Sequence, residues 1–223
     1  MIVAAVPVKD LVNAKQRLVD VLTPFERRAL ARAMLADVLR ALATTGLDRV
    51  WVVTRDREVR AVAGEAGADV LGEDENRGHT AAVARAQAEA ARLGADVFLT
   101  VPGDVPCVGS DEIDALARAA ADRPAAVFAP SRSGRGTNGV ALNPPDAMPL
   151  TFGEPSFDNH LAAARARGLP PRVLRLPRLA LDVDDAGDLR ALLAEGGATE
   201  SGRLLASLGV AARVATRAAT GRL

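Results

Sequence analysis

The sequence contains one cysteine, no tyrosine and few aromatic residues, and its charges balance. Cys107 stands alone among 223 residues, so a disulfide within the chain is excluded and a reducing compartment fits. Aromatic residues make up 3% of the chain, too few for the stacking surfaces that bind single-stranded nucleic acid. The 28 basic and 28 acidic residues give a net charge of zero, which excludes a global field that would attract nucleic acid or an anionic membrane.

Long hydrophobic runs are also missing. No stretch approaches the roughly 20 apolar residues that cross a bilayer. The chain starts with MIVAAVPVKD, whose apolar run is only about seven residues long and has no basic segment before it. This start predicts a buried strand rather than a signal peptide. We therefore expect a cytoplasmic globular protein, with no nucleic acid and no membrane among its partners.

Apolar runs alternate with alanine-rich helical stretches along the chain. The pattern predicts strands over 1–8, 49–54, 68–73, 96–104, 125–130, 139–143 and 172–176. It predicts helices over 23–42, 56–66, 79–94, 110–121, 156–168 and 185–195. Such alternation is typical of a mostly parallel sheet covered by helices on both faces. We therefore expect a single α/β domain of three layers, α/β/α, over 1–210, followed by a frayed tail over 211–223.

Charged residues collect where the predicted strands end, which is where open α/β sheets bind ligands. Three are cations after the first strand, one is a carboxylate after the fourth strand, and two are carboxylates after the apolar run LALDV. They are Lys9, Lys15, Arg17, Asp104, Asp182 and Asp184. Lysine, arginine and glycine-rich turns bind phosphate, and carboxylates bind Mg²⁺. A metal that bridges a nucleoside triphosphate to an attacking oxyanion would use these groups.

The charged residues also have purely structural interpretations. The three cations could form a solvated loop, and Asp104 could be a turn residue. Asp182 could simply end a strand. Asp184 or Asp185 could be only the cap of the helix over 185–195, with Asp188 part of that cap. From the residues alone these alternatives stay open.

Other chemistry-bearing residues give weaker signals. His79 and His160 lie at helix starts, where capping or packing is the ordinary role, and Cys107 fits a small buried residue better than a nucleophile. The sequence has no zinc-ligand spacing, no Gly-x-Ser-x-Gly elbow and no phosphate loop with Gly-Lys-Ser/Thr.

Six segments, in this order, resemble one family. They are VPVKDLVNAKQRL (6–18), AMLADVLRAL (33–42), GDVPC (103–107), RGTNGVAL (135–142), FGEPSFDNH (152–160) and LDVDDAGDL (181–189). The chain resembles the CofC or FbiD guanylyltransferases of deazaflavin coenzyme (F-420) biosynthesis from about residue 2 to residue 192. That resemblance implies the Rossmann-like, glycosyltransferase-A-type nucleotidyltransferase fold.

The resemblance also implies a role for each matching position. Divalent metal, Mg²⁺, would be held by Asp104, Asp182 and Asp184. The catalytic, phosphate-binding cations would be Lys9, Lys15 and Arg17. The phospho-acid would be bound by Thr137, Gly153 and Ser156, with His160 close by. The nucleotide would be contacted by Gly78 and Thr80.

The chain departs from related patterns in three places. Sugar-nucleotide relatives have a glycine-rich Gly-x-Gly-Thr-Arg loop after the first strand, so lysines would do more of the phosphate binding here. Thr80 stands where the family pattern has an asparagine. Cys107 stands where leucine is commoner, and it could line the acceptor pocket.

The implied reaction is guanylyl transfer. The phosphate of 2-phospho-L-lactate, phosphoenolpyruvate or 3-phosphoglycerate would attack the α-phosphorus of GTP, and pyrophosphate would leave. A phosphate monoester has a second pKa of about 6, so it needs no strong general base at pH 7. The expected partners are GTP, the phospho-acid, the next transferase of the pathway and a second copy in a homodimer. The rival classes are a molybdopterin- or sugar-phosphate-type nucleotidyltransferase, and a non-catalytic nucleotide-binding module on the same fold.

Overall fold

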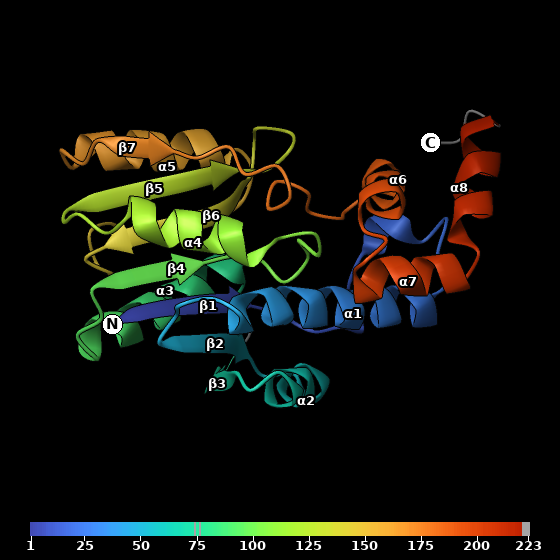
Figure 1. The fold of residues 1–223 in the computed structure, drawn as a ribbon, viewed down its shortest axis with the longest axis horizontal. Coiled ribbons are helices and arrows are strands. Elements are labelled where there is room, and N and C mark those ends of the chain that lie inside the picture. Colours follow the sequence, from blue (N-terminus) through green and yellow to red (C-terminus); the bar gives the residue numbers. More distant parts are fainter. Residues whose placement is uncertain (74, 76, 220–223) are drawn as a thin grey trace.

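A seven-stranded sheet forms the centre of the computed structural model, which describes residues 1–73, 75 and 77–219 (Figure 1). The strands are β1 (Ile2–Pro7), β2 (Arg49–Thr54), β3 (Asp69–Gly72), β4 (Val97–Thr100), β5 (Ala125–Pro130), β6 (Thr137–Asn143) and β7 (Pro171–Val173). Their order is β3-β2-β1-β4-β6-β5-β7. All pairs are parallel except those of β6, which runs antiparallel to both β4 and β5.

Helices cover both faces of the sheet, as predicted. They are α1 (Pro24–Ala43), α2 (Arg57–Glu65), α3 (His79–Arg92), α4 (Ser110–Ala119), α5 (Ser156–Ala166), α6 (Ala186–Glu195), α7 (Glu200–Ser207) and α8 (Val210–Ala219), with a short 3-10 helix η1 (Gln16–Leu18). One hydrophobic core lies between the sheet and α1, α2 and α4, and continues to α6–α8. The other lies between the sheet and α3 and α5. The prediction of a single three-layer, mostly parallel sheet is therefore confirmed.

The buried residues explain why these segments form these elements. In β1, Val3 and Ala5 enter one core while Ala4 enters the other, as expected for a central strand covered on both faces. In α1, Thr23 and Glu26 form the predicted capping box. None of the helices in the described part of the chain is long and apolar enough to span a membrane.

Two predictions about local structure are wrong. Asp182 does not end a strand, because residues 179–183 form an irregular segment between β7 and α6, and Asp184 follows in the same segment. The apolar side chains of this segment are buried. Its backbone forms a hydrogen bond with a loop instead of a strand, because the Val183 N–H donates to the Asp104 carbonyl at 3.1 Å. Asp104 itself lies in the loop beyond the end of β4 at Thr100. Burial rather than strand pairing therefore produced the apolar pattern.

The expected frayed tail over 211–223 is wrong for residues 211–219, which belong to α8. Val214 is buried in the same core as α6 and α7, and Arg213 forms an ion pair with Glu26 of α1 at 2.9 Å. Val210 and Val214, which lie one helical turn apart and are both buried, mark the apolar side of this helix, and it packs on the neighbouring helices α6 and α7. Residues 220–223 lie outside the described residues.

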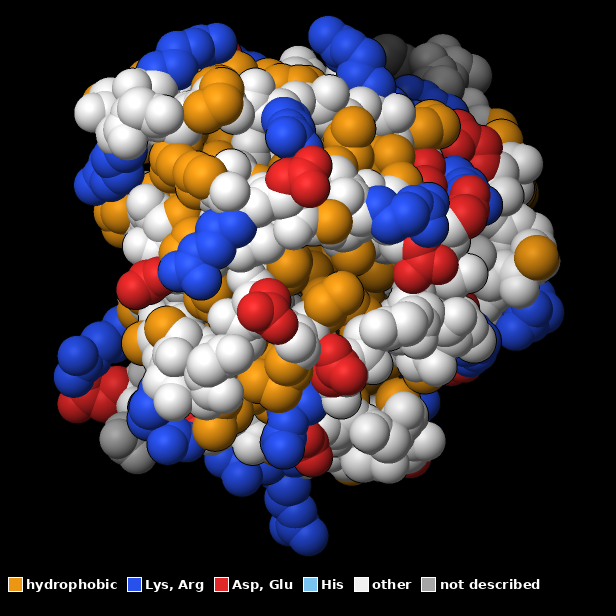
Figure 2. Space-filling model, turned by 60° about the vertical axis from the view of Figure 1, so that its left-hand side comes forward, with side chains coloured by type: hydrophobic (Ala, Val, Ile, Leu, Met, Phe, Trp, Pro, Cys, Tyr) orange, Lys and Arg blue, Asp and Glu red, His pale blue; other side chains and the backbone are white. Residues whose placement is uncertain are grey.

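The loops of the site lie together at the carboxyl ends of the parallel strands. The parallel strands point toward the side of the molecule where α6, α7 and α8 lie (Figure 1). Because β6 is antiparallel, its first residues Thr137 and Asn138 lie at this same edge. On the face drawn in Figure 2, acidic and basic side chains are interspersed, in keeping with the zero net charge.

A buried carboxylate attaches α7 to α1. Asp37, whose side chain is 2% exposed, accepts hydrogen bonds from the N–H groups of Glu200 and Ser201 at 2.7 and 2.9 Å and pairs with Arg40 at 2.7 Å. Asp37→Ala leaves these donors without their acceptor, so we expect the free energy of unfolding to fall by about 3 kcal/mol. Urea denaturation measures this, with Asp122→Ala on the exposed surface as control, expected within about 0.5 kcal/mol of wild type. Equal effects of the two changes would contradict the attachment.

Candidate active site

A cavity of about 430 Å³ opens at the carboxyl ends of the parallel strands. It lies between the start of α3, the loop after β4, the start of β6 and the loop before α5. Its lining includes Gly78, Thr80, Asp104, Thr137, Gly153, Ser156, Asp182 and Asp184. A second cavity of about 210 Å³ is lined by the loop after β1, including Lys9 and Lys15. The two cavities share His79, Pro102 and Asp104. Residues from six distant segments therefore meet at one place.

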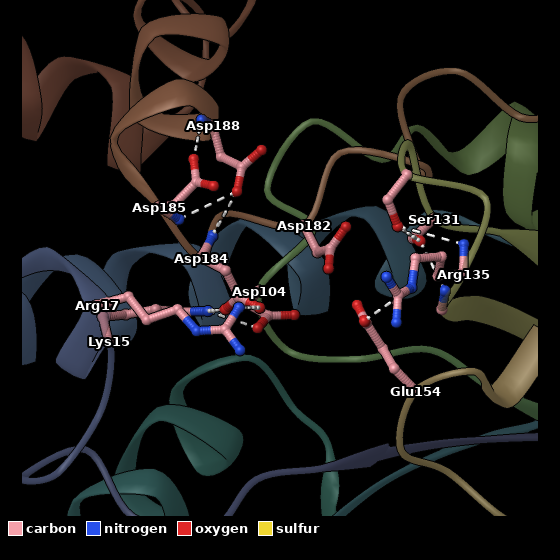
Figure 3. A network of polar contacts seen from close by, with 12 residues as sticks. Lys15, Arg17, Asp104, Ser131, Arg135, Glu154, Asp182, Asp184, Asp185 and Asp188 are labelled. Atoms are coloured by element: carbon pink, nitrogen blue, oxygen red, sulfur yellow. Dashed lines mark hydrogen bonds and ion pairs between the residues drawn. The ribbon is translucent and has the colours of Figure 1, made fainter. Parts of the chain in front are cut away.

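Lys15 is the electrostatic centre of this place. Its Nζ donates to Asp104 Oδ2 at 2.5 Å and to Asp184 Oδ1 at 2.9 Å, and its side chain is only 8% exposed (Figure 3). Burial by itself lowers the pKa of Lys15, but the two carboxylates outweigh burial and raise that pKa above its ordinary value. The ammonium therefore stays charged at any working pH.

The backbone at Lys15 is unusual as well. Its φ of 56° makes it the one non-glycine residue with a positive φ in the described part of the chain. A left-handed conformation costs a residue with a Cβ roughly 1–2 kcal/mol. The paired carboxylates offset that cost, because this conformation brings the side chain to them.

The other two predicted cations do not share this position. The Arg17 side chain is 77% exposed, and one of its nitrogens lies 4.0 Å from Asp184 Oδ2, a long ion pair. Lys9 is exposed on the wall of the second cavity. Of the three predicted cations, Lys15 is therefore buried, whereas Lys9 and Arg17 are exposed at the rim of the site.

The structure also separates Asp184 from the helix cap. The cap of α6 is made by Asp185, whose Oδ1 accepts from the N–H groups of Gly187 and Asp188 at 2.7 and 3.0 Å. In return, Asp188 Oδ2 accepts from the N–H groups of Asp184 and Asp185 at 3.0 and 3.1 Å. The Asp184 carboxylate takes no part in the cap and turns toward Lys15 (Figure 3).

Asp182 is held by Asn138, a buried residue at the start of β6. Asn138 Nδ2 donates to Asp182 Oδ1 at 3.0 Å and to the carbonyl of Leu179 at 3.1 Å. Burial raises the pKa of Asp182; the bond from Asn138 opposes this, while the charges of Asp104 and Asp184 add to it. The carboxylates thus repel one another across the cavity.

This arrangement can be tested for its fit to a divalent cation. Among the described residues, no three His, Cys, Asp or Glu side chains form a group that could enclose a metal ion. However, the Lys15 ammonium already touches both Asp104 and Asp184, so one positive charge can reach the two carboxylates. Mg²⁺ is commonly bound through one or two carboxylates together with substrate phosphates and water. The donor set fits Mg²⁺, and the repulsion at Asp182 would be relieved by it.

The start of α3 forms the wall between the two cavities. Its N-cap is Gly78, whose φ of 92° favours glycine, and its first residue is His79. Burial lowers the pKa of His79, and its ring lies 4.5 Å from that of Phe152. The Thr80 hydroxyl accepts from the Phe152 N–H at 2.9 Å, so it connects α3 to the loop before α5.

The opposite wall comes from the loop before α5. Gly153 has a φ of 113°, and Ser156 is buried at the first position of α5. An ion pair of 3.2 Å between Arg135 and Glu154 lies at the rim (Figure 3). His160 is 1% exposed and lines neither of the two cavities, so it is placed behind the wall rather than in contact with a ligand.

The comparison with known families agrees with this geometry. The chain matches the model of the family described as "Guanylyl transferase CofC like" over residues 2–223. It belongs to this family. A phosphoenolpyruvate guanylyltransferase of Sphaerobacter thermophilus is 45% identical over 194 residues, which cover 85% of this chain and 91% of the relative. A 2-phospho-L-lactate guanylyltransferase of Methanothermobacter thermautotrophicus is 38% identical over 205 residues, covering 92% and 90%.

Solved structures support the predicted nucleotidyltransferase fold. A putative nucleotide-diphospho-sugar transferase of Desulfovibrio desulfuricans superposes with a TM-score of 0.79 at 15% identity, covering 96% of this chain and 97% of that one. The CMP:2-keto-3-deoxy-manno-octonic acid synthetase complexed with CTP gives a TM-score of 0.57 at 16% identity, covering 87% and 99%. At these identities the likeness concerns the fold alone.

Two residues of this CofC-like site did not stand out in the sequence. Asn138 belongs to the RGTNGVAL segment, in which the sequence assigns a role to Thr137 and none to the asparagine. His79, at the junction of the two cavities, was given only a capping or packing role; its place in NRGHTAAV at a helix start was the available signal. Conversely, Cys107 lines neither of these cavities, and burial raises the pKa of its thiol to about 11.

Neighbouring aspartates allow a matched test of the site. Asp184→Ala removes a charge beside Lys15, and we expect guanylyltransferase turnover to fall roughly 100-fold or more while stability stays close to wild type. Asp185→Ala removes the cap of α6, and we expect a loss of about 1 kcal/mol in unfolding free energy with turnover retained. Steady-state kinetics and thermal melts of both variants measure this. The reverse pattern would assign Asp184 to the cap.

Proposed function

We propose that this chain is a Mg²⁺-dependent guanylyltransferase that joins GTP to a three-carbon phospho-acid and releases pyrophosphate, in coenzyme F-420 biosynthesis. The observation that carries the proposal is the buried Lys15 ammonium between Asp104 and Asp184, at the junction of two cavities. Two cavities suit two substrates, and their junction is where the reacting phosphates would meet.

The residues at the junction have complementary tasks. One or two of the carboxylates of Asp104, Asp182 and Asp184 would hold Mg²⁺ together with substrate phosphates and water, and the ion would supply positive charge to the phosphates when bound. Lys15 would orient the two carboxylates and donate to a phosphate oxygen. The start of α3, a helix of 14 residues, points N–H groups and a positive dipole end at the cavities, which suits the nucleotide phosphates.

The proposed reaction needs no protein base. The acceptor phosphate is largely dianionic at pH 7, because its second pKa is about 6. Burial lowers the pKa of His79, so its ring is neutral at that pH and adds no charge at the junction. Positioning of the two substrates and neutralisation of their charge would therefore carry the catalysis.

Among the acceptors, we favour phosphoenolpyruvate. Relatives named phosphoenolpyruvate guanylyltransferase range from 35% to 45% identity, whereas those named 2-phospho-L-lactate guanylyltransferase are 38% and 32% identical. The proposal includes the next transferase of the pathway as product acceptor. The homodimer and the cytoplasmic location stay predictions.

Pyrophosphate release tests the reaction. We expect release from GTP and phosphoenolpyruvate with Mg²⁺, loss of it with chelator, and its return when Mg²⁺ is added in excess. Reactions without acceptor control for GTP hydrolysis, and 2-phospho-L-lactate and 3-phosphoglycerate are offered in parallel. Equal release with ATP, CTP and GTP would reject the nucleotide assignment, and no release with any of the three acids would reject the proposed function.

The cations of the loop after β1 should differ in importance. Lys15→Ala leaves Asp104 and Asp184 facing each other without their ammonium, so we expect turnover to fall roughly 100-fold or more. Arg17→Ala changes an exposed side chain 4.0 Å from Asp184, and we expect a loss of less than about tenfold and little effect of Arg17→Lys. Steady-state kinetics with saturating Mg²⁺ compare the three variants. Comparable losses in Lys15→Ala and Arg17→Ala would mean that Arg17 also grips phosphate.

A further inference from the structure

Three buried polar side chains form a hydrogen-bonded network that extends from the wall of the larger cavity to a histidine behind it. His160 Nδ1 lies 3.0 Å from Thr137 Oγ1, and Ser156 Oγ lies 3.3 Å from the same oxygen. On the far side of the ring, the backbone N–H of Thr151 donates to His160 Nε2 at 3.1 Å. Thr137 and Ser156 line the cavity, whereas His160 does not.

These contacts determine which nitrogen of the His160 ring carries a hydrogen. A backbone N–H can only donate, so His160 Nε2 is an acceptor and carries no hydrogen. A neutral ring must then carry its hydrogen on Nδ1, which donates to Thr137 Oγ1. Because the Ser156 hydroxyl donates to the same oxygen, both lone pairs of Thr137 are occupied. The hydrogen of the Thr137 hydroxyl is what remains for a ligand in the cavity.

The packing around the ring holds it in this state. Phe128 of β5 stacks on His160 at 5.5 Å with an angle of 8° between the rings, and Phe152 meets it edge-on at 5.1 Å. Burial lowers the pKa of His160 to about 4, so the ring is neutral at pH 7. Turning the ring over would break the bonds to Thr137 and Thr151 together.

We propose that His160 is a positioning residue which, as the Nδ1–H tautomer, makes Thr137 a hydrogen-bond donor to an anionic oxygen of the phospho-acid. This inference rests on the proposed function, and it gives His160 a role that needs no direct contact with the substrate. Carboxylate and phosphate oxygens only accept hydrogen bonds at pH 7. If Nδ1 were bare, the Thr137 hydroxyl would have to donate to it and would turn a lone pair toward the anion.

The ring state can be read directly by ¹⁵N NMR of the wild-type protein. We expect a protonated Nδ1 and a bare Nε2 for His160, whereas free histidine prefers the opposite tautomer. Loss of the assigned signal in His160→Asn identifies the residue. An Nε2–H or imidazolium signal would overturn the inference.

A double-mutant cycle tests whether His160 acts through Thr137. Thr137→Val and His160→Ala should each raise the dissociation constant for phosphoenolpyruvate roughly tenfold, and the double variant should be no worse than either single one. Calorimetry measures these constants, with GTP as the control ligand, whose dissociation constant should not change. Additive losses, or equal losses for GTP, would overturn the inference.

Conservative variants guard against simple loss of folding. Thr137→Ser keeps the hydroxyl, and His160→Asn places an amide donor near the position of Nδ1, so both should retain more affinity for phosphoenolpyruvate than Thr137→Val and His160→Ala. Failure of both rescues would count against the inference. Absence of pyrophosphate release by the wild type would reject the proposed function alone, because the NMR signal and the dissociation constants are measured without turnover.

Discussion

The buried ammonium of Lys15 is the interaction on which the site depends. It joins the loop after β1 to Asp104 in the loop after β4 and to Asp184 before α6, residues separated by 89 and 169 positions in the chain. A charge that is 8% exposed is tolerated in a protein only when it is paired. The same pairing keeps two carboxylates close together in a half-buried place, where they would otherwise repel each other. Folding therefore assembles one charged site from three distant segments of the chain.

Hydrogen bonds around Lys15 determine which of the neighbouring aspartates cap a helix and which face the site. Asp185 and Asp188 satisfy the N–H groups at the start of α6, which leaves the adjacent Asp184 carboxylate for Lys15. Asn138 holds Asp182 from the side of the sheet. Of the four acidic residues in LDVDDAGD, Asp185 and Asp188 thus form the capping box of α6, whereas Asp182 and Asp184 are left as carboxylates of the site.

Strand β6 connects the two halves of the site. Consecutive residues of a strand face opposite sides, and at the start of β6 Asn138 contacts Asp182 while Thr137 contacts His160. The antiparallel direction of β6 puts this pair at the edge where the parallel strands end. A buried polar network is stable only when each of its members is hydrogen-bonded. Because Thr137 and Asn138 are neighbours in β6, the same stretch of backbone positions the cavity wall at Thr137 and the carboxylate of Asp182.

The sequence by itself determined the elements, the three-layer sheet and the family, because periodicity, caps and short motifs are local properties of the chain. It also named eight of the residues that line the larger cavity, including Asp104, Asp182 and Asp184. Only the tertiary structure decided that Lys15 is buried while Arg17 is exposed, that His160 stands behind Thr137, and that residues 210–219 form a packed helix. Burial and side-chain direction arise from contacts between segments far apart in the sequence. Lys15 and Arg17 are both cations of one loop, and the sequence does not distinguish their surroundings. The fold places Lys15 between two carboxylates and leaves Arg17 in water.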